Sequence, residues 1–279
     1  MRLVVGFPPG GSVDRIARIL APELARAAGR SVVVENVPGA NSARAIARVA
    51  ASEPNGETLL LGSSAVAHPD NAAGADALRP VILTSTTPML LVVRASMPVH
   101  DPNEFARYVA AHPDTIYGSS GVGNATHLCA AHLMARLGAE AVHVPYSGSS
   151  PAFADLVAGR LDFIMTGANS SLGAHPAIRA LAVTTRGRSR LPGLEALPTI
   201  AETLVPDFDF GLWQAVYVPA KTPDATVEAL IARFREVLAT PSVRGPLAES
   251  GVEIVAGSPD EVERMLRLEA RRFRERVSP

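Results

Sequence analysis

The sequence is poor in cysteine, in basic excess and in long apolar runs, and each shortage excludes a class of protein. Cys129 is the one cysteine among 279 residues, so an intrachain disulfide and a thiolate metal cluster are both excluded. The sequence holds no run of about 18 apolar residues, so we expect no membrane-spanning helix. A formal net charge of −1 lacks the basic excess of nucleic-acid-binding proteins, so we expect no nucleic-acid partner.

Signatures of catalysis and of cofactor binding are also missing. The sequence has no G-x-S-x-G nucleophile elbow. The glycine-rich stretch 118–123 lacks the G-x-G-x-x-G spacing of a dinucleotide fold. His127 and His132 lie five positions apart, which is the wrong spacing for two metal ligands on one helical face. We therefore expect no enzyme, no cofactor and no metal.

Hydrophobic periodicity in the first part of the chain alternates between strand and helix. Residues 2–5, 31–35 and 58–62 are short apolar runs that predict strands, and the Val-rich second run predicts a strand buried on both faces. Helices are predicted from Ser12 onward and over 43–52, the second being stopped by a Pro-Asn-Gly turn. A β-α-β-α-β order predicts a parallel sheet covered by helices, and hence the α/β class.

Small and polar residues follow two of these strands. Gly10 and Gly11 come directly before the helix that begins at Ser12, and Ser63 and Ser64 end the third strand. Backbone N–H groups at a helix start, together with the helix dipole, suit an anion. Since ligands of open α/β sheets sit beyond the carboxyl ends of strands, we expect both turns at one carboxylate site if the two strands are neighbours.

The middle of the chain repeats this design. Strands are predicted at 80–85 and 89–94, and a strand at 115–119 leads through a Gly/Ser-rich turn into a helix. The Pro-rich break near residue 97 predicts one crossing between lobes, and the apolar stretch 210–219 predicts a return crossing. We therefore predict lobe one from residues 1–96 plus 219–279 and lobe two from residues 97–218, closing over a small ligand.

Six motifs in order connect the sequence to a known family. They are Phe7-Pro8-Pro9-Gly10-Gly11-Ser12-Val13-Asp14, Val34-Glu35-Asn36-Val37-Pro38-Gly39-Ala40, Tyr117-Gly118-Ser119-Ser120-Gly121-Val122-Gly123, His127-Leu128, Val142-His143-Val144-Pro145-Tyr146 and Arg179-Ala180-Leu181-Ala182-Val183-Thr184. With them the chain resembles, from residue 2 to about 275, the periplasmic substrate-binding proteins of tripartite tricarboxylate transporters, the Bug family.

The resemblance implies a type II periplasmic-binding-protein fold, two α/β lobes joined by two crossings with a ligand cleft between them. It implies a periplasmic solute-binding protein that captures a small organic carboxylate and delivers it to the membrane permease subunits of a tripartite transporter. It further implies a monomer whose export signal has been removed or lies outside this sequence. Two alternatives remain open: an enzyme on the same scaffold using hydroxyls such as Ser63, Ser120 or Thr166, and a ligand-dependent sensory component.

Carried over position by position, the resemblance and the turns predict the ligand-binding set. It comprises Phe7, Pro9, Gly10, Gly11, Ser12, Asp14, Ser63, Ser64, Ser120, Gly121, Asn124, Thr126, His127, Ser147, Ser149, Thr166 and Trp213.

Three of these residues have a second interpretation that the sequence leaves open. Asp14 either contacts the ligand or tightens the first turn of its helix, and His127 either faces the ligand or holds its loop by a hydrogen bond. Trp213 either stacks on the ligand or packs at a lobe crossing.

The sequence departs from the family pattern at three places. The segment after Ser64 is shorter than usual, and Ser147 stands where lysine is frequent. Thr166 stands where the family often has an aspartate that can meet an amino group. We therefore expect a carboxylate ligand without an ammonium group.

Overall fold

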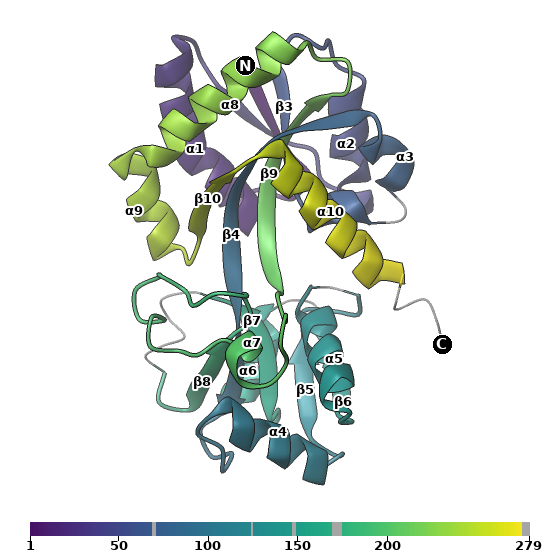
Figure 1. The fold of residues 1–279 in the computed structure, drawn as a ribbon, viewed down its shortest axis with the longest axis vertical. Coiled ribbons are helices and arrows are strands. Elements are labelled where there is room, and N and C mark those ends of the chain that lie inside the picture. Colours follow the sequence, from purple (N-terminus) through teal and green to yellow (C-terminus); the bar gives the residue numbers. More distant parts are fainter. Residues whose placement is uncertain (69–70, 124, 147–148, 169–174, 275–279) are drawn as a thin grey trace. The chain divides into compact units, whose positions relative to one another are not determined.

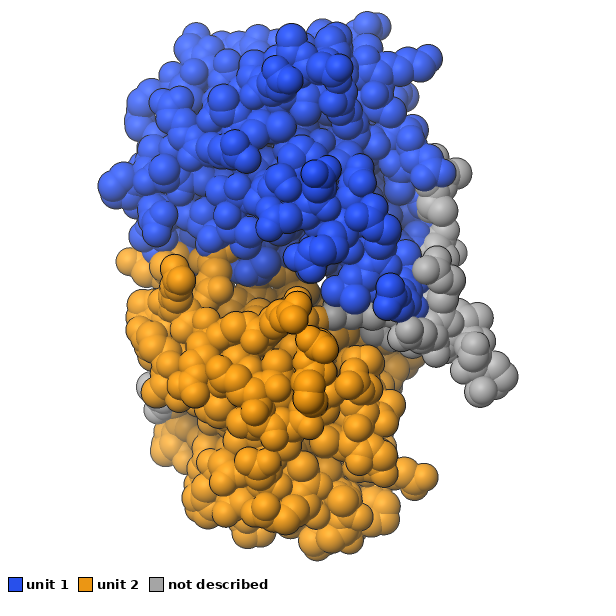
Figure 2. Space-filling view, in the orientation of Figure 1, with its two compact units in different colours: residues 1–86, 213–247, 254–279 blue, residues 87–212, 248–253 orange. Residues whose placement is uncertain are grey.

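The computed structural model describes residues 1–68, 71–123, 125–146, 149–168 and 175–274. The chain divides into two compact units (Figure 2). Unit 1 comprises Met1–Thr86, Trp213–Leu247 and Ile254–Pro279, and unit 2 comprises Thr87–Leu212 and Ala248–Glu253. No described helix combines the length and the apolar character that crossing a membrane requires.

Helices and strands alternate along most of the chain (Figure 1). In order they are β1 (Arg2–Val5), α1 (Ser12–Ala28), β2 (Val33–Asn36), the 3-10 helix η1 (Ala40–Ser42), α2 (Ala43–Ala50), β3 (Thr58–Ser63), the 3-10 helix η2 (Ser64–Ala67), α3 (Ala72–Ala75), β4 (Leu78–Arg94), α4 (Pro102–Ala111), β5 (Ile116–Ser119), α5 (Ala125–Leu137), β6 (Val142–Pro145), α6 (Ser149–Val157), β7 (Phe163–Gly167), β8 (Ile178–Val183), α7 (Ile200–Thr203), β9 (Gly211–Pro219), α8 (Asp224–Ala239), α9 (Pro241–Glu249), β10 (Glu253–Gly257) and α10 (Pro259–Arg274).

The sheet of unit 1 has β1 between β2 and β3. Both pairings are parallel, with Val4 opposite Glu35 on one side and Leu60 on the other. Strand β9 then pairs antiparallel with β3, β4 follows β9, and β10 pairs with β4. The predicted β-α-β-α-β order and the adjacency of the first and third strands are thus confirmed. As a result, the carboxyl ends of β1, β2 and β3 share one edge of the sheet.

Helices cover both faces of this sheet (Figure 1). On one face α1 packs against α8, because α1 carries a continuous apolar stripe that includes the fully buried Leu20 and Leu24. On the other face Val4 and Leu60 pack in a buried cluster with α2 and α10 side chains such as Ile46. The sheet therefore holds β1 and β3 rigidly beneath the loops that follow them.

Strand β2 differs from its prediction. The Val-rich run suggested a strand buried on both faces, but β2 is the terminal strand of the sheet order and Val33 is 57% exposed. The Val-rich composition reflects β-propensity, which an edge strand shares with a central one.

The sheet of unit 2 repeats the parallel arrangement. Strand β5 lies between β6 and β7 and is parallel to both, and β4 pairs antiparallel with β7 and with β8. Leu90, Leu156 and Ile164 belong to its buried apolar cluster, and Phe105 meets Phe163 edge to face with ring centroids 5.1 Å apart. The carboxyl ends of β5, β6 and β7 therefore also share one edge.

The first two boundaries between the units fall inside strands. Strand β4 runs unbroken over 17 residues, where the sequence predicted two strands, and the boundary lies between Thr86 and Thr87. The second boundary lies within β9, between Leu212 and Trp213. The predicted boundaries were at 96/97 and 218/219. The two sets differ because the Pro-rich break follows the end of β4, whereas the unit changes in the middle of the strand.

A short C-terminal segment, 248–253, belongs to unit 2 rather than to the first lobe as predicted. Its Glu253 carboxylate accepts hydrogen bonds from the Ser189 hydroxyl and from the Arg190 N–H, both in unit 2. These contacts join residues about 60 positions apart, which local sequence patterns do not reveal.

Candidate functional site

The loop between β1 and α1, residues 6–11, is exposed at its centre. Pro8, Pro9 and Gly10 are exposed, and Gly10 has a left-handed backbone with a φ of 85°. That conformation favours glycine because a side chain would be strained there, although no atom lies within 4 Å of a Cβ added at Gly10. At the base of the loop, a Cβ on Gly6 would collide with the Ser42 hydroxyl. Glycine thus lets the loop turn sharply and pack closely.

The first turn of α1 leaves backbone donors open. The first helical hydrogen bond runs from the Arg15 N–H to the Gly11 oxygen (2.9 Å). The N–H groups of Ser12, Val13 and Asp14 have no hydrogen-bond partner among the described residues, and the Ser12 side chain is exposed. Together with the positive end of the helix dipole, these donors can hold a carboxylate.

The Asp14 carboxylate holds the β1–α1 loop from below. It accepts hydrogen bonds from the Gly10 N–H (2.8 Å), from the Arg18 Nε (2.9 Å) and from the Asn36 Nδ2 (2.9 Å). The same Asn36 nitrogen donates to the Phe7 oxygen (3.0 Å). The loop is therefore tied at both of its ends to α1 and to the end of β2.

Asp14 is buried and ionised. Asp14 is 1% exposed, while the Arg18 side chain is 54% exposed. The hydrogen bond from Arg18 is the main reason that the pKa of Asp14 falls to about 2; burial opposes this, and the Gly10 and Asn36 bonds add to it. The carboxylate thus acts as an acceptor with three donors from its own chain, which fits the tightening role left open by the sequence.

The two predicted serines lie where β3 ends and η2 begins. Ser63 is the last residue of β3, and its hydroxyl accepts from the Ala65 N–H (3.3 Å) and so caps η2, which begins at Ser64. The side chain of Asn71, just before α3, holds this turn from the other side. The Asn71 Nδ2 donates to the Ala65 oxygen (2.7 Å) and to the Asn41 oxygen (2.9 Å).

The turn at η1 has an unusual backbone conformation that the sequence did not reveal. Ala40, Asn41 and Ser42 all have positive φ values, of 46°, 50° and 73°. Such left-handed residues are strained and persist only where their surroundings fix them. Here Asn71 holds the Asn41 oxygen, and the Ser42 hydroxyl donates to the Gly6 oxygen (3.4 Å).

Sequence reasoning missed four residues around the β1–α1 loop: Arg18, Asn36, Ser42 and Asn71. A usable signal existed for Asn36 alone, since it is a polar residue at the carboxyl end of a parallel strand.

In unit 2, a threonine hydroxyl and a histidine ring hold residues 120–123, the described part of the loop between β5 and α5. The Thr126 Oγ1 accepts from the Ser120 N–H (2.8 Å) and lies 2.8 Å from the Ser120 hydroxyl. The Gly123 N–H donates to the His127 Nδ1 (3.1 Å). His127 therefore holds its loop by a hydrogen bond, which was one of its two interpretations.

A stack of rings lies beneath this loop. His127 stacks on His143 with centroids 4.0 Å apart, and His143 stacks on Tyr117 at 4.9 Å. The His143 Nε2 lies 2.7 Å from the Ser119 hydroxyl, which also accepts from the Gly121 N–H (3.2 Å). Burial lowers the pKa of His143, which favours its neutral form.

The remaining predicted residues lie on other strands and helices. Thr166 is 7% exposed near the carboxyl end of β7, beside β5, and Ser149 is exposed at the start of α6. Trp213 is fully buried in the apolar cluster of unit 1, and its indole N–H has no partner among the described residues. Asn124 and Ser147 lie outside the described residues.

Within each unit the structure thus gathers predicted residues at one sheet edge. Phe7 to Asp14 join Ser63 and Ser64 at the carboxyl ends of β1 and β3, and the 120–127 segment joins Thr166 at the ends of β5 and β7.

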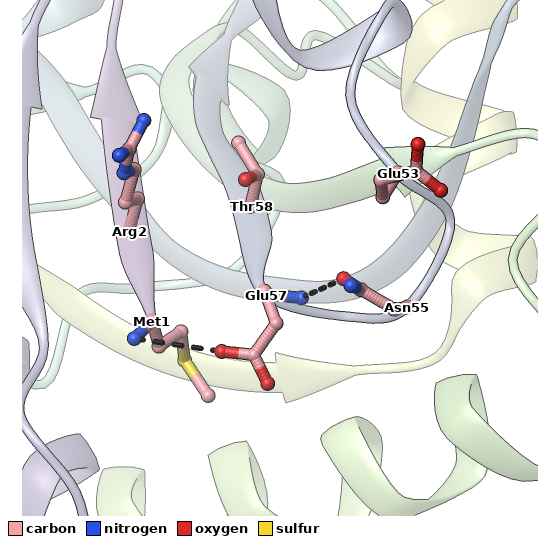
Figure 3. A pocket seen from close by; sticks show the side chains of 6 residues that line it. All are labelled: Met1, Arg2, Glu53, Asn55, Glu57 and Thr58. Atoms are coloured by element: carbon pink, nitrogen blue, oxygen red, sulfur yellow. Dashed lines mark hydrogen bonds and ion pairs between the residues drawn. The ribbon is translucent and has the colours of Figure 1, made fainter.

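Cavities elsewhere fit an anion poorly. A cavity of ≈ 310 Å³ at the amino ends of β1 and β3 is lined by Glu53, Asn55 and Glu57, among others (Figure 3). The Glu57 carboxylate lies 3.6 Å from the Met1 amino group, and the Glu57 N–H donates to the Asn55 Oδ1 (2.9 Å). A second cavity of ≈ 500 Å³, whose lining includes Met134 and Glu140, lies at the amino ends of β5 and β6. Neither lies at the edges where the loops gather.

The described residues contain no group of three or more His, Cys, Asp or Glu side chains that could hold a metal ion.

Comparison with known proteins places these loops in context. Residues 16–277 match the family model described as the tripartite tricarboxylate transporter family receptor. A Pseudomonas sp. (strain P51) protein, named for the tcbD-tcbE intergenic region, is 34% identical over 98% of this chain and 84% of its own length.

Two solved structures are similar over nearly the whole chain. An R. palustris protein determined with adipate is 32% identical, with a TM-score of 0.78, covering 99% of this chain and 95% of that one. MatC from Rhodopseudomonas palustris, with bound malate, is 30% identical, with a TM-score of 0.75, covering 99% and 97%.

Proposed function

Because the chain belongs to the tripartite tricarboxylate transporter receptor family, we propose that it binds a small organic carboxylate and delivers it to the permease subunits of such a transporter. It works in the periplasm as a monomeric binding protein and leaves its ligand chemically unchanged. The adipate and malate in the similar R. palustris structures support a dicarboxylate as the first ligand to test.

One observation in the structure carries the proposal. The N–H groups of Ser12, Val13 and Asp14 are open at the start of α1, beside a loop whose exposed centre includes Gly10. A carboxylate oxygen placed there gains charge-assisted hydrogen bonds and the favourable end of a 17-residue helix dipole. Ser63 and Ser64, at the end of the neighbouring β3, supply further polar groups.

The ligand lacks an ammonium group. Thr166 is buried and neutral where a carboxylate would be needed to pair with an amine. A buried ammonium without a partner costs far more than it gains. Adipate and malate should therefore bind more tightly than aspartate and glutamate in a calorimetric titration.

The test compares two glycines at opposite ends of α1. Gly10 and Gly29 both have left-handed backbones, with φ values of 85° and 64°, and neither has an atom within 4 Å of an added Cβ. Gly10→Val and Gly29→Val therefore impose similar local strain, of roughly 1–2 kcal/mol. Gly10→Val should abolish carboxylate binding in calorimetry, while Gly29→Val should bind as the wild type does.

Retained affinity in Gly10→Val would show that the β1–α1 loop does not hold the carboxylate. Mass analysis of the ligand after prolonged incubation separates binding from catalysis, since any conversion rejects a pure binding protein.

A further inference from the structure

Asp14 brings a negative charge to the place where an anion is to be bound. It is the third residue of α1, and its own N–H is one of the open donors. An uncompensated carboxylate at this distance repels a carboxylate ligand and offsets the attraction of the helix dipole. Binding at this loop therefore requires that the charge of Asp14 be cancelled.

Arg18 is placed to cancel it. It lies one helical turn further along α1, its Nε donates to the Asp14 Oδ2 (2.9 Å), and its Nη2 donates to the Asn36 Oδ1 (3.2 Å). Asn36 in turn donates to the other Asp14 oxygen. The guanidinium is thus engaged on two groups of the network that holds the loop.

The hydrogen-bond partners of Asp14 give it a role in holding the β1–α1 loop. Its partners at Gly10, Arg18 and Asn36 are all donors, so a carboxylate, which only accepts, fits the position. Asp14 is then a positioning residue, which agrees with one of the two interpretations that the sequence left open.

We propose that Arg18, acting through Asp14, sets the carboxylate affinity of the β1–α1 loop: it neutralises the Asp14 charge and holds the loop with the Ser12, Val13 and Asp14 N–H groups open. This inference rests on the proposed function. Arg18 contacts Asp14, which supports the loop, and does not contact the bound ligand.

The experiment measures the affinity of two Arg18 variants for adipate and malate by calorimetry at pH 7. Arg18→Met removes the positive charge and leaves that of Asp14, and it should weaken binding by about tenfold. Arg18→Lys keeps a positive charge within reach of Asp14 and should stay within about threefold of the wild type.

Arg26→Met is the matched control. Arg26 lies in the last turn of the same helix and pairs with Glu23, whose side chain is 8% exposed. Its loss perturbs α1 to a similar degree but far from the loop, so affinity should not change.

The outcomes separate the two proposals. If the wild type binds neither adipate nor malate nor any other carboxylate in a thermal-shift screen, the proposed function fails, and this inference fails with it. If the wild type binds and Arg18→Met binds equally well, this inference alone fails. It also fails if Arg26→Met loses as much affinity as Arg18→Met. A loss in Arg18→Lys as large as that in Arg18→Met contradicts it as well, because it would indicate a direct contact of the Arg18 guanidinium with the ligand.

Discussion

The β1–α1 and β5–α5 loops follow the same backbone design but are held by different chemistry. Each connects a parallel strand to the helix that follows it. The first is tied to the ionised Asp14, with Arg18 beside it. The second is tied to the hydroxyl of Thr126 and to the imidazole of His127. A fold that needs two preformed loops can thus fix one by charge and the other by neutral hydrogen bonds.

The charge of Asp14 makes the β1–α1 loop resistant to acid. The pKa of Asp14 lies at about 2, so its hydrogen bonds persist through the whole physiological range.

The largest effect is expected from Asp14→Asn. The new amide N–H groups would face the N–H groups of Gly10, Arg18 and Asn36, which are themselves donors. We therefore expect a loss of about 2–3 kcal/mol in the free energy of unfolding. Urea titrations followed by the fluorescence of Trp213 measure it, since this single tryptophan is fully buried in unit 1. Asp207→Asn is the control, because Asp207 is 80% exposed in its pair with Arg186 and should change stability by less than about 0.5 kcal/mol.

The difference in the free energy of unfolding between the wild type and Asp14→Asn should change with pH in one direction. Because the folded pKa of Asp14 lies below the ordinary aspartate value of 3.8, its stabilisation is present above about pH 4 and is lost as the pH falls toward 2. The stability gap between wild type and Asp14→Asn should narrow over that window. A gap that is constant from pH 7 to pH 2 would contradict the charged account of this loop.

A smaller effect is expected from Thr126→Val, which removes an uncharged hydrogen bond that holds the β5–α5 loop. The change keeps the shape of the side chain but leaves the Ser120 N–H without its acceptor, at a cost of about 1–2 kcal/mol. Amide hydrogen exchange at Ser120 should accelerate, and Thr126→Ser should restore protection. Unchanged exchange in Thr126→Val would mean that Thr126 does not hold the loop.

The smallest effect is expected from the acid response of His143. Burial lowers its pKa, so the unfolded chain takes up the proton first and stability declines as the pH falls below about 6.5. His143→Gln keeps a nitrogen that can reach the Ser119 hydroxyl and removes the titration. The decline between pH 7 and pH 5 should be shallower in this variant, by less than about 1 kcal/mol; an identical decline would assign it to other groups.

Local patterns in the sequence predicted the elements that hold these loops. The strand at residues 2–5, the helix from Ser12 and the neighbouring strand at residues 58–62 follow from apolar periodicity, and the structure has all three. The turn at Gly10 and Gly11 could be predicted as well, because glycine is the usual residue where the backbone must turn sharply.

What the sequence could not supply were contacts between distant residues. Asn36 lies 22 positions from Asp14, and nothing local pairs them. Likewise, the edge position of β2 depends on which strands pair, and the unbroken course of β4 depends on partners from β7 and β8. The ligand-binding residues themselves stay predictions, since they rest on the resemblance and on where the loops lie.

The most direct test of the account is a backbone amide NMR titration with adipate at pH 7. The N–H groups of Ser12, Val13 and Asp14 should show the largest downfield proton shifts, because each gains a charge-assisted hydrogen bond. The Gly10 N–H should shift little, since Asp14 already holds it. Adipate binding without shifts at Ser12, Val13 and Asp14 would contradict the claim that the β1–α1 loop holds the carboxylate.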